Sequence, residues 1–110
     1  MEIHPYTIEY YLTANNKKPF KEWMDGLDRV TRAKIRVRLD RVSLGNLGRN
    51  RHVGEGVYEL KIDYGPGYRV YYALNGKTVI LLLLGGDKST QEKDIQQAKY
   101  FWTDHKERNR

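Results

Sequence analysis

The sequence lacks cysteine, long hydrophobic runs and a secretory signal, and each absence excludes a class of protein. Without cysteine there is no disulfide framework, no thiolate chemistry and no cysteine-ligated metal site. The longest apolar run, residues 79–84, is far too short to span a bilayer. The N-terminus shows no basic stretch followed by an apolar one. These features predict one cytoplasmic domain over residues 1–110, without a membrane partner.

Positive charge is in excess, and it is concentrated in one segment. The 110 residues include 20 Lys and Arg against 14 Asp and Glu, a formal charge of +6, and 39% are apolar, enough for one modest core. Residues 29–52 contain eight basic residues and one acidic residue, so this segment carries +7 and the remainder −1. Because like charges on one helix repel each other, the cluster predicts an anionic partner, either RNA or an acidic protein.

The N-terminal half of the sequence predicts a strand followed by two helices. Residues 6–12 are rich in β-branched and aromatic residues, which favours a strand. Pro19 fits the first position of a helix, and Asp28 can cap a second helix that runs to about residue 47. This second helix carries two apolar stripes on opposite sides, so we expect it to pack against both the first helix and a sheet. The stripes consist of Val30, Ala33, Val37 and Leu44, and of Ile35, Leu39 and Val42.

The C-terminal half predicts three strands and a final helix. The strands are residues 57–64, 68–74 and 77–84, separated by the turns Gly65-Pro66-Gly67 and Asn75-Gly76 and ended by Gly85-Gly86. Residues 89–92, S-T-Q-E, form a capping box that opens the last helix. The order β-α-α-β-β-β-α predicts an α+β fold in which a helical hairpin packs on a small, mostly antiparallel sheet. We expect the other face of the sheet to be partly open.

The alternation of the middle strands places Lys61 and Arg69 on this open face, with Glu59 and Tyr71 beside them. Lys88 follows the last strand and could reach the same edge. Two interpretations remain open: salt bridges with a structural role, or a cationic platform for phosphate with tyrosine available for base stacking. Cleavage of RNA by its own 2′-hydroxyl needs a base, a cation and an acid. Arginine suits the cation, Lys61 or Glu59 could act as base, and Lys88 or Tyr71 as acid.

Histidine does not point to a metal or cofactor. His4, His52 and His105 are widely separated, without metal-ligand spacing or a neighbouring carboxylate cluster. We therefore predict no metal site and no cofactor. His52 lies in the basic loop, where it could contact nucleic acid or simply be a surface residue.

The segments VYELKIDYGPGYRVYY, GGDKSTQEKDIQQA and KPFKEWMDGLD resemble toxins of the RelE/ParE superfamily, most closely the HigB-like branch often called addiction-module killer proteins. The resemblance covers residues 6–102 and rests on the order and spacing of these pieces. It implies a RelE-like fold and the toxin of a type II toxin–antitoxin system. The activity implied is a metal-independent, ribosome-dependent mRNA endoribonuclease that blocks translation. The ParE branch implies instead a non-enzymatic gyrase inhibitor, and a third alternative is an inactive relative that only binds a partner or RNA.

The resemblance also implies particular residues and partners. Lys61, Arg69 and Lys88 match the basic residues of the catalytic site. A cognate antitoxin, expected to be a helix-turn-helix protein, and the ribosome with its mRNA are the implied partners. The residues expected to contact ribosomal RNA or the antitoxin are Arg38, Arg41, Arg49 and Arg51. His52 and Tyr71 complete the residues predicted to bind nucleic acid.

Overall fold

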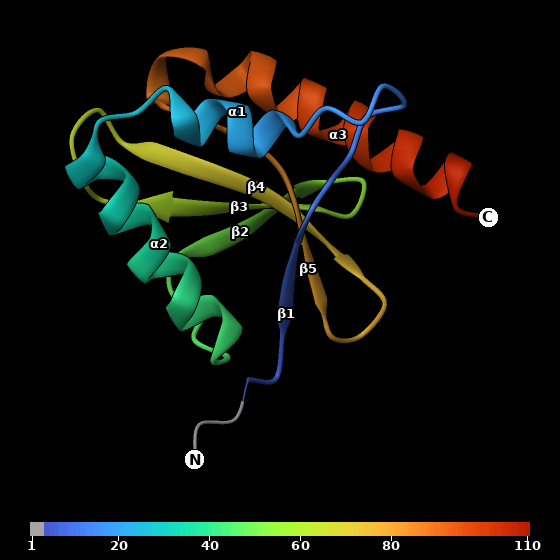
Figure 1. The fold of residues 1–110 in the computed structure, drawn as a ribbon, viewed down its shortest axis with the longest axis horizontal. Coiled ribbons are helices and arrows are strands. Elements are labelled where there is room, and N and C mark those ends of the chain that lie inside the picture. Colours follow the sequence, from blue (N-terminus) through green and yellow to red (C-terminus); the bar gives the residue numbers. More distant parts are fainter. Residues whose placement is uncertain (1–3) are drawn as a thin grey trace.

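The computed structural model describes residues 4–110, which form one five-stranded mixed sheet with helices on both faces (Figure 1). The sheet order is β1-β5-β4-β3-β2, with β1 parallel to β5 and the other neighbours antiparallel. The predicted α+β class and mostly antiparallel sheet are confirmed, but the predicted order omits one strand. In chain order the elements are β1 (Thr7–Tyr10), α1 (Pro19–Asp25), α2 (Arg29–Ser43), β2 (Asn50–Gly54), β3 (Val57–Ile62), β4 (Tyr68–Asn75), β5 (Val79–Gly86), the 3₁₀ turn η1 (Lys88–Thr90) and α3 (Gln91–Arg108).

The strand that the sequence did not predict is β2, which forms one edge of the sheet. Its sequence N-R-H-V-G has a single apolar β-branched residue and lies among glycines, a composition typical of a loop. It nevertheless pairs antiparallel with β3, with a register shift between His52 and Gly54. Backbone pairing with β3 therefore creates this strand, and its own side chains give no signal for it.

Helices α1 and α2 pack on one face of the sheet. Asp28 caps α2 as predicted, because its carboxylate accepts a hydrogen bond of 3.2 Å from the backbone N–H of Thr31. The stripe of Ile35, Leu39 and Val42 is buried against the sheet together with Phe20 and Met24 of α1. The helix ends at Ser43 and not near residue 47 as predicted. Gly45, two residues after this end, has a left-handed conformation with φ of +98°, which is typical of a residue that follows a helix.

The second apolar stripe of α2 stays in solvent. Val30 is 55% exposed and Val37 is 51% exposed, and Leu44 is also exposed. The expectation that α2 is covered on both sides is therefore wrong for the described residues 4–110. The first helix packs on β5, so it leaves this side of α2 uncovered.

The face expected to be partly open is covered by α3. Ile95, Ala98 and Trp102 of this helix pack against Tyr71 and Leu83 of the sheet. The apolar stripe of α3 needs such a surface, and the sheet provides it on the side that α1 and α2 leave free. Only the end of this face, around Lys61 and η1, remains accessible.

The connection into α3 differs from the predicted capping box. The carboxylate of Asp87 accepts a hydrogen bond of 2.8 Å from the backbone N–H of Ser89, and this interaction starts η1. Thr90 then precedes α3 without a side-chain cap, and its hydroxyl donates to Asp94 at 2.6 Å. β5 ends at Gly86, so the glycine pair marks the end of the strand as predicted, although both glycines still belong to it. Lys88 is therefore carried by a short turn that leads from β5 into α3.

Candidate functional site

Two adjoining hollows at the shared end of β3 and β4 form what we call the cationic cleft. Their volumes are about 410 Å³ and 470 Å³, and both are lined by Lys61 and Arg69. Lys88 lines the first hollow, so all three residues predicted to be catalytic border one cleft. The first hollow is lined by Lys61, Asp63, Tyr64, Gly65, Pro66, Gly67, Arg69 and Lys88, and the second by Arg49, Asn50, Arg51, Glu59, Lys61, Arg69 and Gln91.

The turn between β3 and β4 positions the cations of the cleft. Lys61 and Arg69 are direct partners in the antiparallel register of the two strands. Gly67 has φ of +80°, and its carbonyl accepts a hydrogen bond of 2.5 Å from Nη1 of Arg69. A Cβ at this position would lie 3.1 Å from Nη1 of Arg69 and 3.9 Å from Cβ of Lys88. The glycine therefore gives the Arg69 guanidinium room against this turn, and η1 lies within ordinary contact distance of the same turn.

Arg69 is a buried cation with incomplete hydrogen bonding. Its side chain is only 7% exposed, which corrects the expectation of an open platform, since α3 covers the sheet beside it. Its Nε lies 3.8 Å from Oε2 of Glu59 and has no hydrogen-bond partner. A buried charge whose donors are not all satisfied gains stability when an anion binds nearby. This property makes Arg69 a candidate phosphate-binding residue.

Glu59 holds the charge of Arg69 in place and is itself fully engaged. It is 4% exposed and accepts hydrogen bonds from Nε of Arg51 at 3.0 Å, Nε2 of Gln91 at 2.8 Å and the hydroxyl of Tyr71 at 3.3 Å. Burial by itself would raise the pKa of Glu59. The hydrogen bonds from Arg51 and Gln91, together with the charges of Arg51 and Arg69, outweigh burial, and the pKa is lowered. An ionised carboxylate with both oxygens occupied is poorly suited to be the base, which removes one of the two candidates for that role.

Tyr71 does not face the cleft. Its side chain is 0% exposed, and burial, followed by the charge of Glu59, raises the pKa of its hydroxyl. The assignments of Tyr71 to base stacking and to proton donation are therefore wrong for this conformation. The cause is again α3, which packs Ile95 and Trp102 in the same cluster as this ring.

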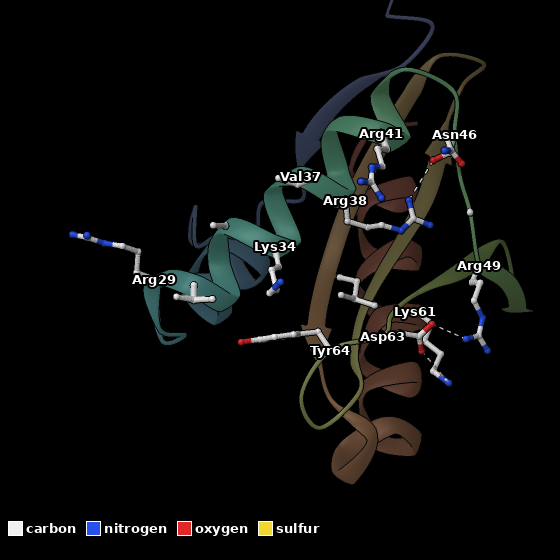
Figure 2. A pocket seen from close by; sticks show the side chains of 14 residues that line it. Arg29, Lys34, Val37, Arg38, Arg41, Asn46, Arg49, Lys61, Asp63 and Tyr64 are labelled. Atoms are coloured by element: carbon white, nitrogen blue, oxygen red, sulfur yellow. Dashed lines mark hydrogen bonds and ion pairs between the residues drawn. The ribbon is translucent and has the colours of Figure 1, made fainter.

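Asp63 is a cleft residue that sequence reasoning did not select as a candidate. It lines the first hollow, where it is the acidic residue among the described lining residues. Its carboxylate accepts a hydrogen bond of 2.6 Å from Nη1 of Arg49 and lies 3.7 Å from Nζ of Lys61, as Figure 2 shows. The strand alternation places Asp63 on the same side as Lys61, and this was the signal that could have identified it.

The residues predicted to bind nucleic acid fall into separate places. Arg49 and Arg51 line the cleft, whereas Arg38 and Arg41 line a different groove beside α2. Arg38 also donates hydrogen bonds to the backbone carbonyls of Asn46, at 3.3 Å, and Leu47. His52 lines neither site. Its Nε2 accepts a hydrogen bond of 3.2 Å from the backbone N–H of Gly56, and its ring packs 5.0 Å from that of Tyr58, which gives it a local structural role.

Within residues 4–110, no group of three or more histidine, cysteine, aspartate or glutamate side chains is arranged to hold a metal ion. In the same range, no helix combines the length and the apolar composition that crossing a membrane requires.

Fold and site together define a small α+β protein with a cationic cleft at one end of its sheet. Residues 22–100 match the model of the family described as "Phage derived protein Gp49-like (DUF891)". The chain therefore belongs to the Gp49-like family. It is also 47% identical over 81 residues to a Haemophilus influenzae protein named "Uncharacterized protein", a match that covers 73% of this chain and 82% of the relative.

This result corrects the family inferred from the sequence motifs. The G-Y-R turn and the G-G-D-K-S junction resemble RelE/ParE toxins, but the matching family is the Gp49-like one, which is a different family. The assignment to the RelE/ParE superfamily and its HigB-like branch is therefore wrong. Neither motif is a strict catalytic signature, so their order along the chain could not distinguish between families of similar layout.

Proposed function

We propose that this protein is the toxin of a toxin–antitoxin pair and that it cleaves messenger RNA in the cationic cleft. The observation that carries the proposal is the convergence of Lys61, Lys88 and the buried, incompletely bonded Arg69 on one cleft. Cations around one hollow can hold a phosphodiester anion and stabilise the further negative charge that develops on it during cleavage. Membership of the Gp49-like family is consistent with a toxin–antitoxin context.

The proposed reaction is attack of an RNA 2′-hydroxyl on the adjacent phosphate. Asp63 lines the hollow beside Lys61 and, unlike the buried Glu59, is exposed, so we assign to it the acceptance of the hydroxyl proton and to Lys61 the role of a cation. The 2′-oxygen forms a bond to phosphorus while the bond to the 5′-oxygen breaks, and Arg69 and Lys61 stabilise the extra negative charge. Lys88 gives its proton to the leaving oxygen. The products are a 2′,3′-cyclic phosphate and a 5′-hydroxyl. Asp63 then releases its proton to solvent, and Lys88 takes one up, which restores the site.

The proposed partners follow from the same toxin assignment. An antitoxin with a helix-turn-helix pattern would neutralise the protein, and the translating ribosome would present the mRNA. The basic surface on α2 and the following loop supports an anionic partner, because an unbalanced cluster of like charges is stabilised by one.

Expression of the chain alone in bacteria tests this proposal. We expect growth arrest with new mRNA 5′ ends, detected by mapping transcript ends. Lys88→Ala should lower the cleavage rate about 100-fold, because a general acid typically contributes a factor of that order. Lys77→Ala is the matched control, since Lys77 is an exposed lysine in the β4–β5 turn, outside the cleft. Reactions of purified protein with RNA, with and without ribosomes, would show whether the ribosome is required.

Three outcomes would contradict the proposal. Growth arrest with intact transcripts and loss of DNA supercoiling would indicate a gyrase inhibitor instead. Growth without arrest, despite folded protein, would indicate an inactive binding protein. Equal cleavage rates for Lys88→Ala and the wild type would show that the reaction does not use the proton donor that the proposal places in the cleft.

A further inference from the structure

The exposed stripe of α2 forms the wall of a second, larger hollow, which we call the α2 groove. Its volume is about 770 Å³, and it lies between α2, the end of β3 and the loop that precedes β2 (Figure 2). Val30, Ala33 and Val37 supply apolar surface from the helix, and Ile62 supplies it from the sheet. Val30 and Val37 are each more than half exposed on the same side of the helix. Contiguous exposed apolar surface of this kind is typical of a site that binds another protein.

The rim of the α2 groove is strongly basic. Arg29, Lys34 and Arg41 extend from the helix, and Arg49 and Lys61 stand at the opposite side, as Figure 2 shows. Within residues 4–110, neither Arg29 nor Arg41 takes part in a salt bridge, and Asp63 is the acidic residue among the groove's lining. The rim therefore has unused positive charge.

We propose that the α2 groove binds an acidic amphipathic helix from a partner protein. A helix with an apolar stripe at i, i+3, i+4 and i+7 can place that stripe on the exposed Val30, Ala33 and Val37. Glutamate or aspartate on either side of the stripe would meet the arginines and lysines of the rim. RNA fits this surface less well, because bases stack on aromatic rings, whereas the apolar wall that α2 forms consists of valine and alanine side chains.

The groove and the cationic cleft share one end. Arg49, Lys61 and Asp63 line both, so a helix that fills the groove as far as this end covers Lys61. Docking of the helix and binding of RNA in the cleft then exclude each other. This last step rests on the proposed function, whereas the docking of the helix does not.

A designed peptide tests the docking. The probe is a fluorescein-labelled, 16-residue helical peptide with leucines at i, i+3, i+4 and i+7 and glutamates flanking them. A second peptide has the same composition with the leucines scattered around the helix. Fluorescence anisotropy titrations with the full chain should give saturable binding of the first peptide and at least tenfold weaker binding of the second.

Two charge-matched variants locate the site. Val30→Glu combined with Val37→Glu changes the net charge by −2, and Arg36→Glu changes it by the same amount on a part of α2 that does not line the groove. We expect the double variant to bind the peptide at least tenfold more weakly and Arg36→Glu to bind it within about twofold of the wild type. All three residues are exposed, and circular dichroism will verify that each variant folds.

Several outcomes would overturn the proposal. It fails if the striped peptide does not bind saturably, or binds the double variant and Arg36→Glu equally. It also fails if the double variant loses affinity for a 12-nucleotide single-stranded RNA instead, which would make the groove an RNA site. The exclusion step is supported if the bound peptide weakens RNA binding, and it fails if both bind independently. If the wild type neither binds this RNA nor cleaves mRNA on ribosomes, the proposed function fails, while the peptide titrations still decide the docking.

Discussion

Glu59 is the residue on which the charge of the cleft depends. It accepts three hydrogen bonds and lies 3.8 Å from Nε of Arg69, so its removal leaves buried donors without an acceptor. Glu59→Gln keeps the shape but loses the charge, and we expect the free energy of unfolding at pH 7 to fall by about 2 kcal/mol. Urea denaturation followed by circular dichroism measures this change. Glu107→Gln, at an exposed position near the end of α3, should change the unfolding free energy little.

The contribution of Glu59 should also depend on pH. Its pKa in the folded protein is lowered from the ordinary value of 4.5. A lowered pKa means that the stabilisation is complete above this ordinary value and is lost as the pH falls through the folded pKa. The difference in unfolding free energy between the wild type and Glu59→Gln should therefore be full at pH 7 and shrink progressively below about pH 4.5. Urea titrations from pH 7 to pH 3 will measure it, and a difference that stays constant would contradict this assignment.

Gly85 is needed for the packing of α1 on the sheet. A Cβ at this position would lie 2.1 Å from Cε3 of Trp23, a distance at which the ring must move. We expect Gly85→Ala to lower the free energy of unfolding by about 2 kcal/mol, as overpacking of a core typically does. Gly26→Ala is the control, because the nearest atom to its Cβ would be 3.5 Å away and its φ is −82°. Equal melting temperatures for the two variants would show that Trp23 moves aside without cost.

At the scale of elements, α3 is attached to the segment that follows β1. The hydroxyl of Tyr11 donates a hydrogen bond of 2.5 Å to Asp104, and Arg108 donates both to Asp104 and to the carbonyl of Leu12. Burial, with the hydrogen bond to Asp104, raises the pKa of Tyr11 to about 12, so its hydroxyl keeps its proton at neutral pH.

Loss of this attachment should loosen the C-terminal turns of α3. Tyr11→Phe keeps the ring against Phe101 but removes the donor, and we expect a loss of about 1 kcal/mol. Hydrogen exchange should become faster in the last turns of α3 and stay unchanged in α2. Tyr100→Phe, an exposed position on the same helix, is the control. Unchanged exchange in α3 would mean that Arg108 alone holds its end.

Elements that carry their own apolar pattern could be predicted from the sequence. The spacing of Phe20 and Met24 and the cap at Asp28 identify α1 and α2, and strict alternation identifies β3 and β4. β2 could not be predicted, because its pairing depends on β3 and its side chains are mostly exposed. Local patterns show which face of a strand is apolar, but the helix that covers the face is determined by tertiary packing.

In the candidate site, too, local patterns predicted some features and tertiary packing determined the others. Lys61 and Arg69 were brought together correctly, because strand alternation and a short turn determine which residues are neighbours. The burial of Arg69 and Tyr71 was missed, because it depends on the position of α3. Asp63 was also missed: strand alternation places it on the side of Lys61, but its contact with Arg49 depends on the pairing of β2 with β3.

At the scale of the whole molecule, the excess of positive charge divides between two neighbouring surfaces. Arg49 and Lys61 belong to both, whereas Lys88 lines only the cationic cleft and Arg41 only the α2 groove. The net charge of +6 therefore does not describe one binding site. If RNA occupies the cleft and a protein helix occupies the groove, loss of a cation from the cleft should change the salt dependence of RNA binding. Loss of a cation from the groove should not change it.

The salt dependence of RNA binding distinguishes the two surfaces. For single-stranded RNA, the slope of log K against log salt is about −0.7 for each phosphate that the protein neutralises. Lys88→Ala should make this slope shallower by about 0.7, because it removes one phosphate contact from the cleft. Arg41→Ala and Lys77→Ala should leave the slope unchanged, since neither residue lines the cleft. Fluorescence anisotropy with a labelled 12-nucleotide RNA, at salt concentrations from about 50 to about 300 mM, measures the slope for the wild type and the three variants. A slope reduced as much by Arg41→Ala as by Lys88→Ala would mean that RNA extends over the α2 groove, and the groove could then not be reserved for a protein partner.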